Sequence, residues 1–341
     1  MNTVTRENAS MKQLSYTVRF LTPAFLGNAE QNGQWRTPPF KALLRQWWRV
    51  AYAAEKQFKV DITAMRREEG LLFGHAWLED DKDKQGQKVA ARKSAIRLRL
   101  NALEQQTAWT TGSQQGIAPL SDGLSTSYAW FGLIQRGNGL PNRTGIKSEV
   151  VAEAVRQLVL AFPDELQPRM EETIALIHAF GLLGSRSRGG WGALNVEGAK
   201  ALQTNDMQRY ARDIDACLQD DWAMSLASDK KGLCVWESKN TFDSWDKAMT
   251  FIAGERKAVR TALKNGKDLR PALGFASPGR MPSPLRWKAI ASQPGKLTVR
   301  VFALPHCIPD EGGKRLSLQD LQSAWRTVSS TLDNSSLQRL N

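Results

Sequence analysis

Alternating apolar and polar side chains mark several strands along the chain. β-Rich segments with this pattern lie at 15–21, 94–100, 128–134 and 191–196. Such alternation places every second side chain on one face of a sheet. The segment at 149–162 mixes helix and strand signals, and its Val and Leu content between close turns favours a strand.

Helical spacing is clearest from Phe40 to about Gln57 and from Pro168 to Leu183. Apolar side chains recur there every three or four residues, as on one buried helix face. Thr37, followed by two prolines, is the expected N-cap of the first helix. Residues 60–92 appear charged and irregular, and 101–127 are predicted to form a long loop or projecting hairpin.

The elements follow one another as strand, helix, strands, helix, strand, which is the ferredoxin-like βαββαβ order with insertions. Beyond Lys200, helices are predicted at about 206–219, 243–264 and 317–332, with strands at 285–291 and 297–304. We therefore predict an α+β protein of tandem ferredoxin-like (RRM-related) domains with insertions. The N-terminal domain is placed at 11–199 and the C-terminal α+β domain at 200–341. No sequence repeat between the halves supports a duplication.

Composition adds a basic surface to this picture. The 341 residues include 47 Lys and Arg against 34 Asp and Glu, a net charge of +13, which indicates a polyanionic partner. The alternative is a basic surface that is merely solvated. No apolar run could cross a bilayer, the first ten residues are polar, and the three cysteines are far apart. We expect a cytoplasmic protein without a membrane partner.

The first helix is the first candidate for nucleic-acid binding. Lys41, Arg45 and Arg49 recur every fourth residue, Arg36 stands at the helix start, and no acid occurs between Arg36 and Ala54. A helix N-terminus suits a phosphate, and the cations could follow a phosphate backbone. The alternative is an ordinary amphipathic helix with a solvated basic face. The absence of acid favours the functional reading, because a merely solvated helix usually mixes both signs of charge.

Residues 181–192, here called the glycine-rich loop, form the second candidate. Glycines permit positive φ and a close approach of the backbone to a ligand, and arginines can reach its phosphates. The loop is neither a P-loop nor a dinucleotide fingerprint, because no Gly-Lys-Ser/Thr ends it and a helix precedes it. The alternative is a tight connection with arginines facing solvent. The candidate residues are Gly184, Ser185, Arg186, Ser187, Arg188, Gly189 and Gly190.

Catalytic chemistry has little support in the sequence. His178 lies on an apolar helix face and is expected in the core, while His75 and His306 lack a neighbouring catalytic partner. The acidic segment 79–83 could hold a divalent ion, but its interleaved lysines favour a solvated loop. We expect no catalytic residues, no metal and no cofactor.

Two stretches resemble the RAMP superfamily of CRISPR-associated proteins, in particular the end-capping RAMP subunits of type III-B effector complexes. They are Leu21-Thr22-Pro23-Ala24-Phe25-Leu26-Gly27-Asn28-Ala29 with Gln31-Asn32-Gly33, and Pro38-Pro39-Phe40-Lys41-Ala42-Leu43-Leu44-Arg45-Gln46-Trp47-Trp48-Arg49. The glycine-rich loop falls where the family has its own. Ala42 and Gly189 depart from the family pattern, which often has glycine and arginine there. The match covers about 14–52 and 177–197.

This resemblance implies tandem ferredoxin-like domains and a subunit at one end of a filament that holds guide and target RNA beside other effector subunits. Target cleavage would belong to a different subunit. It also adds Asn28, Gln31 and Asn32 to the candidate RNA-binding residues. Two other functions stay open: a RAMP-type metal-independent endoribonuclease that processes guide RNA, with a histidine against the glycine-rich loop, and a generic RNA-binding protein that works alone.

Overall fold

The computed structural model is α+β, as predicted, and describes residues 10–29, 34–76, 81–82, 85–101, 129, 155–275, 280–308 and 316–340. The predicted loop at 102–127 lies outside this set. So do the predicted strand at 128–134, apart from Ala129, and the candidate residues Gln31 and Asn32.

The first half forms a four-stranded antiparallel sheet in the order β2-β3-β1-β4. Its strands are β1 (Met11–Phe20), β2 (Arg97–Leu100), β3 (Val155–Pro163) and β4 (Leu194–Glu197). Helices α1 (Thr37–Glu55) and α4 (Gln167–Phe180) pack against each other beside it, and a short 3-10 helix, Asp164–Leu166, precedes α4. The strand predictions at 15–21, 94–100, 149–162 and 191–196 and both helix predictions are thereby confirmed within the described residues, with shifted ends.

The second half has its own four-stranded antiparallel sheet in the order β11-β8-β10-β9. Its strands are β8 (Val235–Ser238), β9 (Leu285–Gln293), β10 (Lys296–Ala303) and β11 (Leu337–Arg339). Helices α7 (Trp245–Ala262) and α8 (Leu318–Asp333) belong to this half, with a 3-10 turn, Arg270–Leu273, between α7 and β9. Both long helices and the β9–β10 hairpin were predicted. In each sheet, the strand that comes first among its four members, β1 or β8, lies between the third and the fourth members in chain order.

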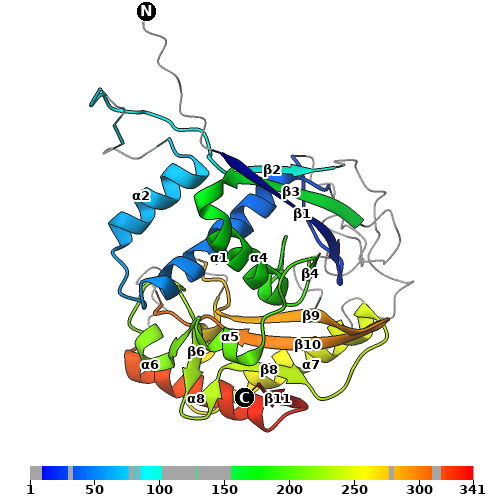
Figure 1. Cartoon of the computed structure of the whole chain (residues 1–341). Coiled ribbons are helices and arrows are strands. Elements are labelled where there is room, and N and C mark those ends of the chain that lie inside the picture. Colours follow the sequence, from blue (N-terminus) through cyan, green and yellow to red (C-terminus); the bar gives the residue numbers. More distant parts are fainter. Residues whose placement is uncertain are drawn as a thin grey trace, which may run out of the picture.

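The two halves are stacked in layers (Figure 1). The first sheet lies above α1 and α4, which lie above β9 and β10, and α7 and α8 cover the other side of the second sheet. Helices α1 and α4 are therefore enclosed between two sheets. This enclosure explains why α1 buries both tryptophans, Trp47 and Trp48.

The core continues from one half into the other. The Trp47 ring lies 6.3 Å from the Phe302 ring of β10, and Phe302 lies 4.9 Å from Phe180 of α4. Burying three aromatic side chains together contributes several kcal/mol of apolar stabilisation at roughly 25 cal/mol per Å². The boundary predicted near residue 200 therefore separates two sheets whose apolar cores are not separate, because both apolar clusters of the protein contain residues of both halves.

Helix α2 (Ile62–Phe73) corrects the expectation that 60–92 is irregular throughout. The Asp61 carboxylate caps it by accepting from the N–H groups of Thr63 at 2.9 Å and Ala64 at 3.2 Å. Its buried face includes Met65, Phe73 and the charged Glu69. Apolar periodicity could not reveal a face that contains a carboxylate.

The single helix predicted at 206–219 is also wrong. The chain there forms α5 (Thr204–Gln208), β5 (Ala211–Asp213) and α6 (Ile214–Cys217). Strand β5 pairs in parallel with β6 (Leu226–Asp229), which pairs in turn with β7 (Gly232–Leu233). Strand pairing of these few residues outweighs the local helical preference, because a short helix is marginal without tertiary support.

Candidate nucleic-acid interface

The structure brings the turn at 21–28 and the glycine-rich loop together. Thr22 Oγ1 donates to the Gly190 carbonyl at 2.7 Å and accepts from the Ala193 N–H at 2.9 Å. The Ser185 N–H donates to the Phe25 carbonyl at 3.1 Å. The turn at 21–28, which ends in the half-buried Asn28, is thus fastened along the glycine-rich loop.

The glycines of this loop serve packing, and this corrects the expectation that they expose backbone to a ligand. The N–H groups of Gly189 and Gly190 donate within the loop, at 2.9 and 3.0 Å. Gly190 has φ of +104°, and a Cβ there would lie 2.8 Å from Ile252 Cδ1. A Cβ on Gly192 would collide with the Leu183 carbonyl oxygen. Strain and crowding therefore account for these glycines without a bound phosphate.

The arginines of the loop differ in their surroundings. Arg186 is exposed, whereas Arg188 is largely enclosed and its Nη1 donates to the Ser283 carbonyl at 3.1 Å. Burial, together with the charge of Arg280, lowers the pKa of Arg188 to about 10. The alternative reading, in which the arginines face solvent, therefore fails for Arg188.

The basic stripe of α1 has an acidic partner that the local sequence does not show. Arg45 Nε lies 2.5 Å from Glu69 Oε1, and Arg49 Nε lies 2.6 Å from Glu69 Oε2. Glu69 belongs to α2 and is 3% exposed. Because α1 itself contains no acid, its cations were expected to have no acidic partner within the protein. This expectation is wrong for Arg45 and Arg49, which both pair with one buried carboxylate.

The start of α1 also differs from the prediction. Arg36, not Thr37, is the N-cap residue, and no side chain caps the helix. Lys41 lies one turn further on, half-buried, with its pKa lowered by burial and by the charge of Arg45. Arg36 and Lys41 form no ion pair with the described residues. Their contact with RNA stays a prediction.

Strand β9 supplies a buried cation that sequence reasoning did not select. Arg286 is 7% exposed, and its guanidinium donates to the side-chain amide oxygen of Gln46 on α1. Its Nε has no hydrogen-bond partner among the described residues. Burial and the charge of Arg188 lower its pKa well below the usual range.

Arg286 lies beside the glycine-rich loop. The Trp287 N–H donates to the Arg188 carbonyl at 3.2 Å, so the loop and β9 run side by side. Burial, with the charges of Arg188 and Arg286, lowers the pKa of His306, and the charge of Asp221 opposes this shift. We call Arg188, Arg280, Arg286 and His306 the seam cluster. Within the described part of the chain, none of its arginines forms an ion pair with a carboxylate.

One signal in the sequence pointed to Arg286. The predicted strand at 285–291 alternates, which places Arg286 and Lys288 on one face and Leu285 and Trp287 on the other. A polar strand face is usually solvated. Here α1 and α4 of the other half cover it, and this covering cannot be inferred from the strand alone.

The neighbouring Lys288 shows what a satisfied buried cation looks like in the same strand. Lys288 is fully buried, and its Nζ donates to the carbonyls of His178 at 2.6 Å and Ile177 at 3.3 Å. Arg300 Nη1 reaches the Ala179 carbonyl at 3.1 Å. These carbonyls form the C-terminal end of α4, where the helix dipole favours positive charge.

The remaining histidines are enclosed. His75 Nε2 lies 2.6 Å from Asp81 Oδ2, and Arg92 also binds this carboxylate. Hydrogen bonding to Arg92 and His75 lowers the pKa of Asp81 to about 2. Asp81 is buried, so the expectation of a solvated loop is wrong for this residue; Glu79, Asp80 and Asp83 lie outside the described residues. His178 accepts from the Val196 N–H at 3.3 Å, which leaves its Nδ1 without a proton.

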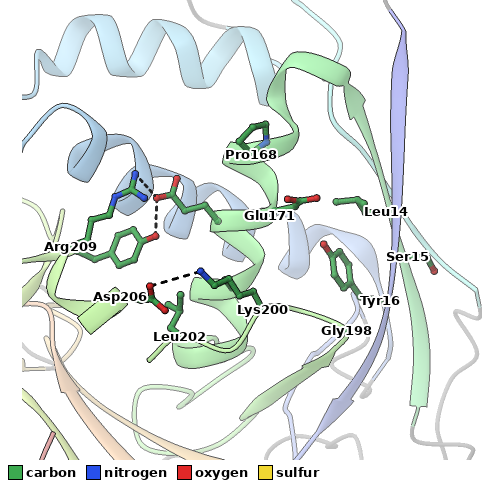
Figure 2. A pocket seen from close by; sticks show the side chains of 13 residues that line it. Leu14, Ser15, Tyr16, Pro168, Glu171, Gly198, Lys200, Leu202, Asp206 and Arg209 are labelled. Atoms are coloured by element: carbon green, nitrogen blue, oxygen red, sulfur yellow. Dashed lines mark hydrogen bonds and ion pairs between the residues drawn. The ribbon is translucent and has the colours of Figure 1, made fainter. Parts of the chain in front are cut away.

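A separate cavity of about 570 Å³ lies between β1, α4 and α5 (Figure 2). Its charged side chains pair with one another. Glu172 accepts from Tyr210 Oη at 2.8 Å and lies 3.1 Å from Arg209, while Lys200 lies 3.9 Å from Asp206. Its cations are therefore already compensated, unlike those of the seam cluster.

Two general properties follow from the described residues. No helix among them combines the length and apolarity needed to cross a bilayer. Within the same ranges, no three His, Cys, Asp or Glu side chains gather as metal ligands would.

Comparison with known proteins places the fold. No protein-family profile matches the sequence, and no curated protein is significantly similar to it. Among solved structures, Cmr1 from Pyrococcus furiosus aligns with a TM-score of 0.52 over 94% of this chain and 96% of that one, at 14% identity. The chain has the fold of Cmr1. This fold agrees with the resemblance to type III-B effector subunits that the sequence showed.

Chains of two other structures align more loosely with the present one. They belong to the type III-B Cmr-beta complex bound to cognate target RNA, the second with AMPPnP in the presence of single-stranded DNA. Their TM-scores are 0.46 and 0.47 at 10% identity, over 94% and 93% of this chain. The alignments cover 99% and 98% of those two chains.

Proposed function

We propose that this chain is a non-catalytic RNA-binding subunit of a type III-B CRISPR effector, which holds guide or target RNA at one end of the filament in antiviral defence. The Cmr1 fold over nearly its whole length supports the effector assignment. The sequence resemblance at 14–52 and 177–197 supports it independently. Such a subunit would work in the cytoplasm beside other effector subunits.

The tandem ferredoxin-like arrangement belongs to this proposal. In each half, one long helix follows the first strand of the four-stranded sheet and another follows the third strand. Both sheets have the same strand order. This equivalence supports two copies of one βαββαβ unit, with α2 inserted in the first and β5–β7 between the two.

The seam cluster is the observation that carries the RNA-binding proposal. Arg188 comes from the glycine-rich loop that resembles the RAMP family, and Arg286 meets it from the other half. Their positive charge has no carboxylate partner among the described residues, so it is available to a polyanion.

A second candidate function has one specific observation in its favour. A metal-independent endoribonuclease would need a histidine against the glycine-rich loop, and His306 is close enough to experience the charge of Arg188. Its Nδ1 lies 2.7 Å from the Cys307 carbonyl and must donate to it, which leaves Nε2 as a base. No second histidine joins it among the described residues, so we favour the non-catalytic role.

Isolation of the native assembly tests the proposed function. The chain is tagged in its own cells, purified at moderate salt, and its RNA and partner proteins are sequenced and identified. We expect guide RNA and further effector subunits. Recovery of the chain alone, without RNA, would contradict the proposal, and recovery of diverse cellular RNA without partners would favour a protein that binds RNA on its own.

Cleavage of a labelled repeat RNA separates the two candidates. The purified chain is incubated with the RNA in EDTA and, separately, with Mg²⁺. We expect no specific product. A defined product in EDTA that disappears in His306→Ala, but persists in the enclosed-histidine control His178→Gln, would establish the endoribonuclease instead.

A further inference from the structure

We propose that the seam cluster binds one phosphate group of the RNA backbone, held jointly by the two halves of the protein. This inference rests on the proposed function and adds the position and chemistry of an anchor. The anchoring side chains are Arg188 and Arg280, with Arg286 behind them as a buried source of positive charge. Because Arg286 is buried, it would act on the phosphate through the electrostatic field of its charge, not through direct contact.

The burial of Arg286 is the first argument. A guanidinium removed from water is unfavourable unless ion pairs and hydrogen bonds replace its hydration. Arg286 has only the amide oxygen of Gln46, and its Nε is without a partner among the described residues. The charge that acts on it, that of Arg188, is also positive. An anion at the cluster would relieve both the desolvation and the repulsion.

The chemistry of the donors is the second argument. A guanidinium presents several N–H groups in a plane and matches the oxygen atoms of a phosphate with two parallel hydrogen bonds. Arg188 uses Nη1 on the Ser283 carbonyl, and Arg280 is exposed. Arg280 lies three residues before Ser283, whose carbonyl accepts from Arg188, and its charge acts on Arg188.

The contrast with other buried cations is the third argument. Arg45 and Arg49 share Glu69, and Lys288 and Arg300 bind the end of α4. At these places the chain itself supplies the negative charge or the carbonyl dipoles. At the seam cluster, the described chain supplies one carbonyl to Arg188 and one amide oxygen to Arg286 but no carboxylate to either arginine, so the compensating negative charge would come from a ligand.

The position of the cluster gives the phosphate a second role. Arg188 belongs to the first half, whereas Arg280 and Arg286 belong to the second. A single anion between them would link the halves, and any ligand that binds only the folded protein stabilises it. We therefore expect the RNA-free protein to be less stable than the anion-bound protein.

Thermal melting with sulfate as the phosphate probe tests this inference on the full chain. Melting is followed in sulfate and in chloride at equal ionic strength, so that charge screening is the same in both. Sulfate also stabilises proteins by exclusion, and the comparison between wild type and variants removes this general effect. The rise in melting temperature from chloride to excess sulfate should be roughly 2–4 °C larger for wild type than for Arg286→Met. In chloride, Arg286→Met should melt at the same temperature as wild type or higher.

Lys288→Met is the matched control. It removes a buried cation from the same face of the same strand, two residues away, and should melt lower than wild type while keeping the full sulfate effect. If Arg286→Met does not fold, Arg188→Gln replaces it, because Arg188 is not fully buried. An equal sulfate effect in wild type and both arginine variants would overturn the inference.

RNA binding distinguishes failure of this inference from failure of the proposed function. Single-stranded RNA should bind Arg188→Gln roughly tenfold or more weakly than wild type. Undiminished binding by Arg188→Gln and by Arg286→Met would overturn the phosphate anchor and leave the RNA-binding function standing. No RNA binding by wild type or by the native assembly would contradict the proposed function itself.

Discussion

The corner between α1 and α2 and the seam between the glycine-rich loop and β9 treat charge in opposite ways. At the corner, two half-exposed arginines surround a carboxylate that is 3% exposed, with nitrogen–oxygen distances of 2.5 and 2.6 Å. At the seam, Arg188 and Arg286 lie together without a carboxylate among the described residues. The corner is complete as it stands, whereas the seam lacks a negative partner.

This difference teaches that a basic pattern in the sequence and an available charge in the fold are separate properties. The strictly spaced stripe on α1 is the more regular pattern, yet its cations are used within the protein. The less regular Arg188 is the one left with unbalanced charge. Buried charge that the chain balances stabilises the fold, and buried charge that it does not balance indicates a ligand.

The largest effect should come from breaking the corner. Replacing Arg45 and Arg49 with Ala leaves the Glu69 carboxylate buried and unpaired. We expect the free energy of unfolding to fall by roughly 3 kcal/mol, measured by urea denaturation. Adding Glu69→Leu to the double variant should restore much of the loss. A double variant as stable as wild type would show that the corner is no more than a surface pair.

A smaller loss should follow from Lys288→Met at the end of α4. This change removes the donor to the His178 and Ile177 carbonyls and should lower the free energy of unfolding by roughly 2 kcal/mol. Arg286→Met on the same strand should lower it little or raise it. Equal losses in the two variants would remove the distinction between a compensated and an uncompensated cation.

The smallest effect concerns acid. Burial, with the charges of Lys288 and Arg300, lowers the pKa of His178 to about 4, against about 6.5 when unfolded. The unfolded chain then binds more protons, so stability should fall as the pH drops from about 6.5 to 4. After allowance for partial exposure, we expect His178 to account for roughly 1–2 kcal/mol of this loss.

Denaturation of His178→Gln at several pH values measures that share. The variant should lose less stability between pH 6.5 and 4 than wild type does. An identical pH dependence in both proteins would mean that His178 protonates freely in the folded state and that the end of α4 is not the enclosed, positively charged site described above.

Local periodicity was sufficient to predict much of the fold. The long strands β1, β9 and β10 and the helices α1, α4, α7 and α8 each bury a continuous apolar face, and their patterns show it. Helix α2 was missed because Glu69 lies on its buried face and is tolerated there only through arginines of α1. The strands β5 to β7 are too short for a period to be visible.

Less of the candidate site could be predicted. Arg188 stood out because glycines and serines surround it, but the packing of those glycines against Ile252 and Leu183 was not visible locally. Arg286 was missed because its burial is created by α1, which lies far from it in the sequence. A residue's charge is written in the sequence, whereas its balance depends on partners that only the fold brings near.

The salt dependence of RNA affinity tests the central claim most directly. The affinity for single-stranded RNA is measured between low and moderate salt for wild type, for Arg188→Gln, and for the triple variant Arg45→Gln, Arg49→Gln, Glu69→Gln, which lowers the net charge by one just as Arg188→Gln does. We predict that the slope of log affinity against log salt falls by about 0.7 in Arg188→Gln, one phosphate contact, and stays unchanged in the triple variant. A reduced slope in the triple variant, with an unchanged slope in Arg188→Gln, would place the RNA on the basic stripe of α1 and contradict the account.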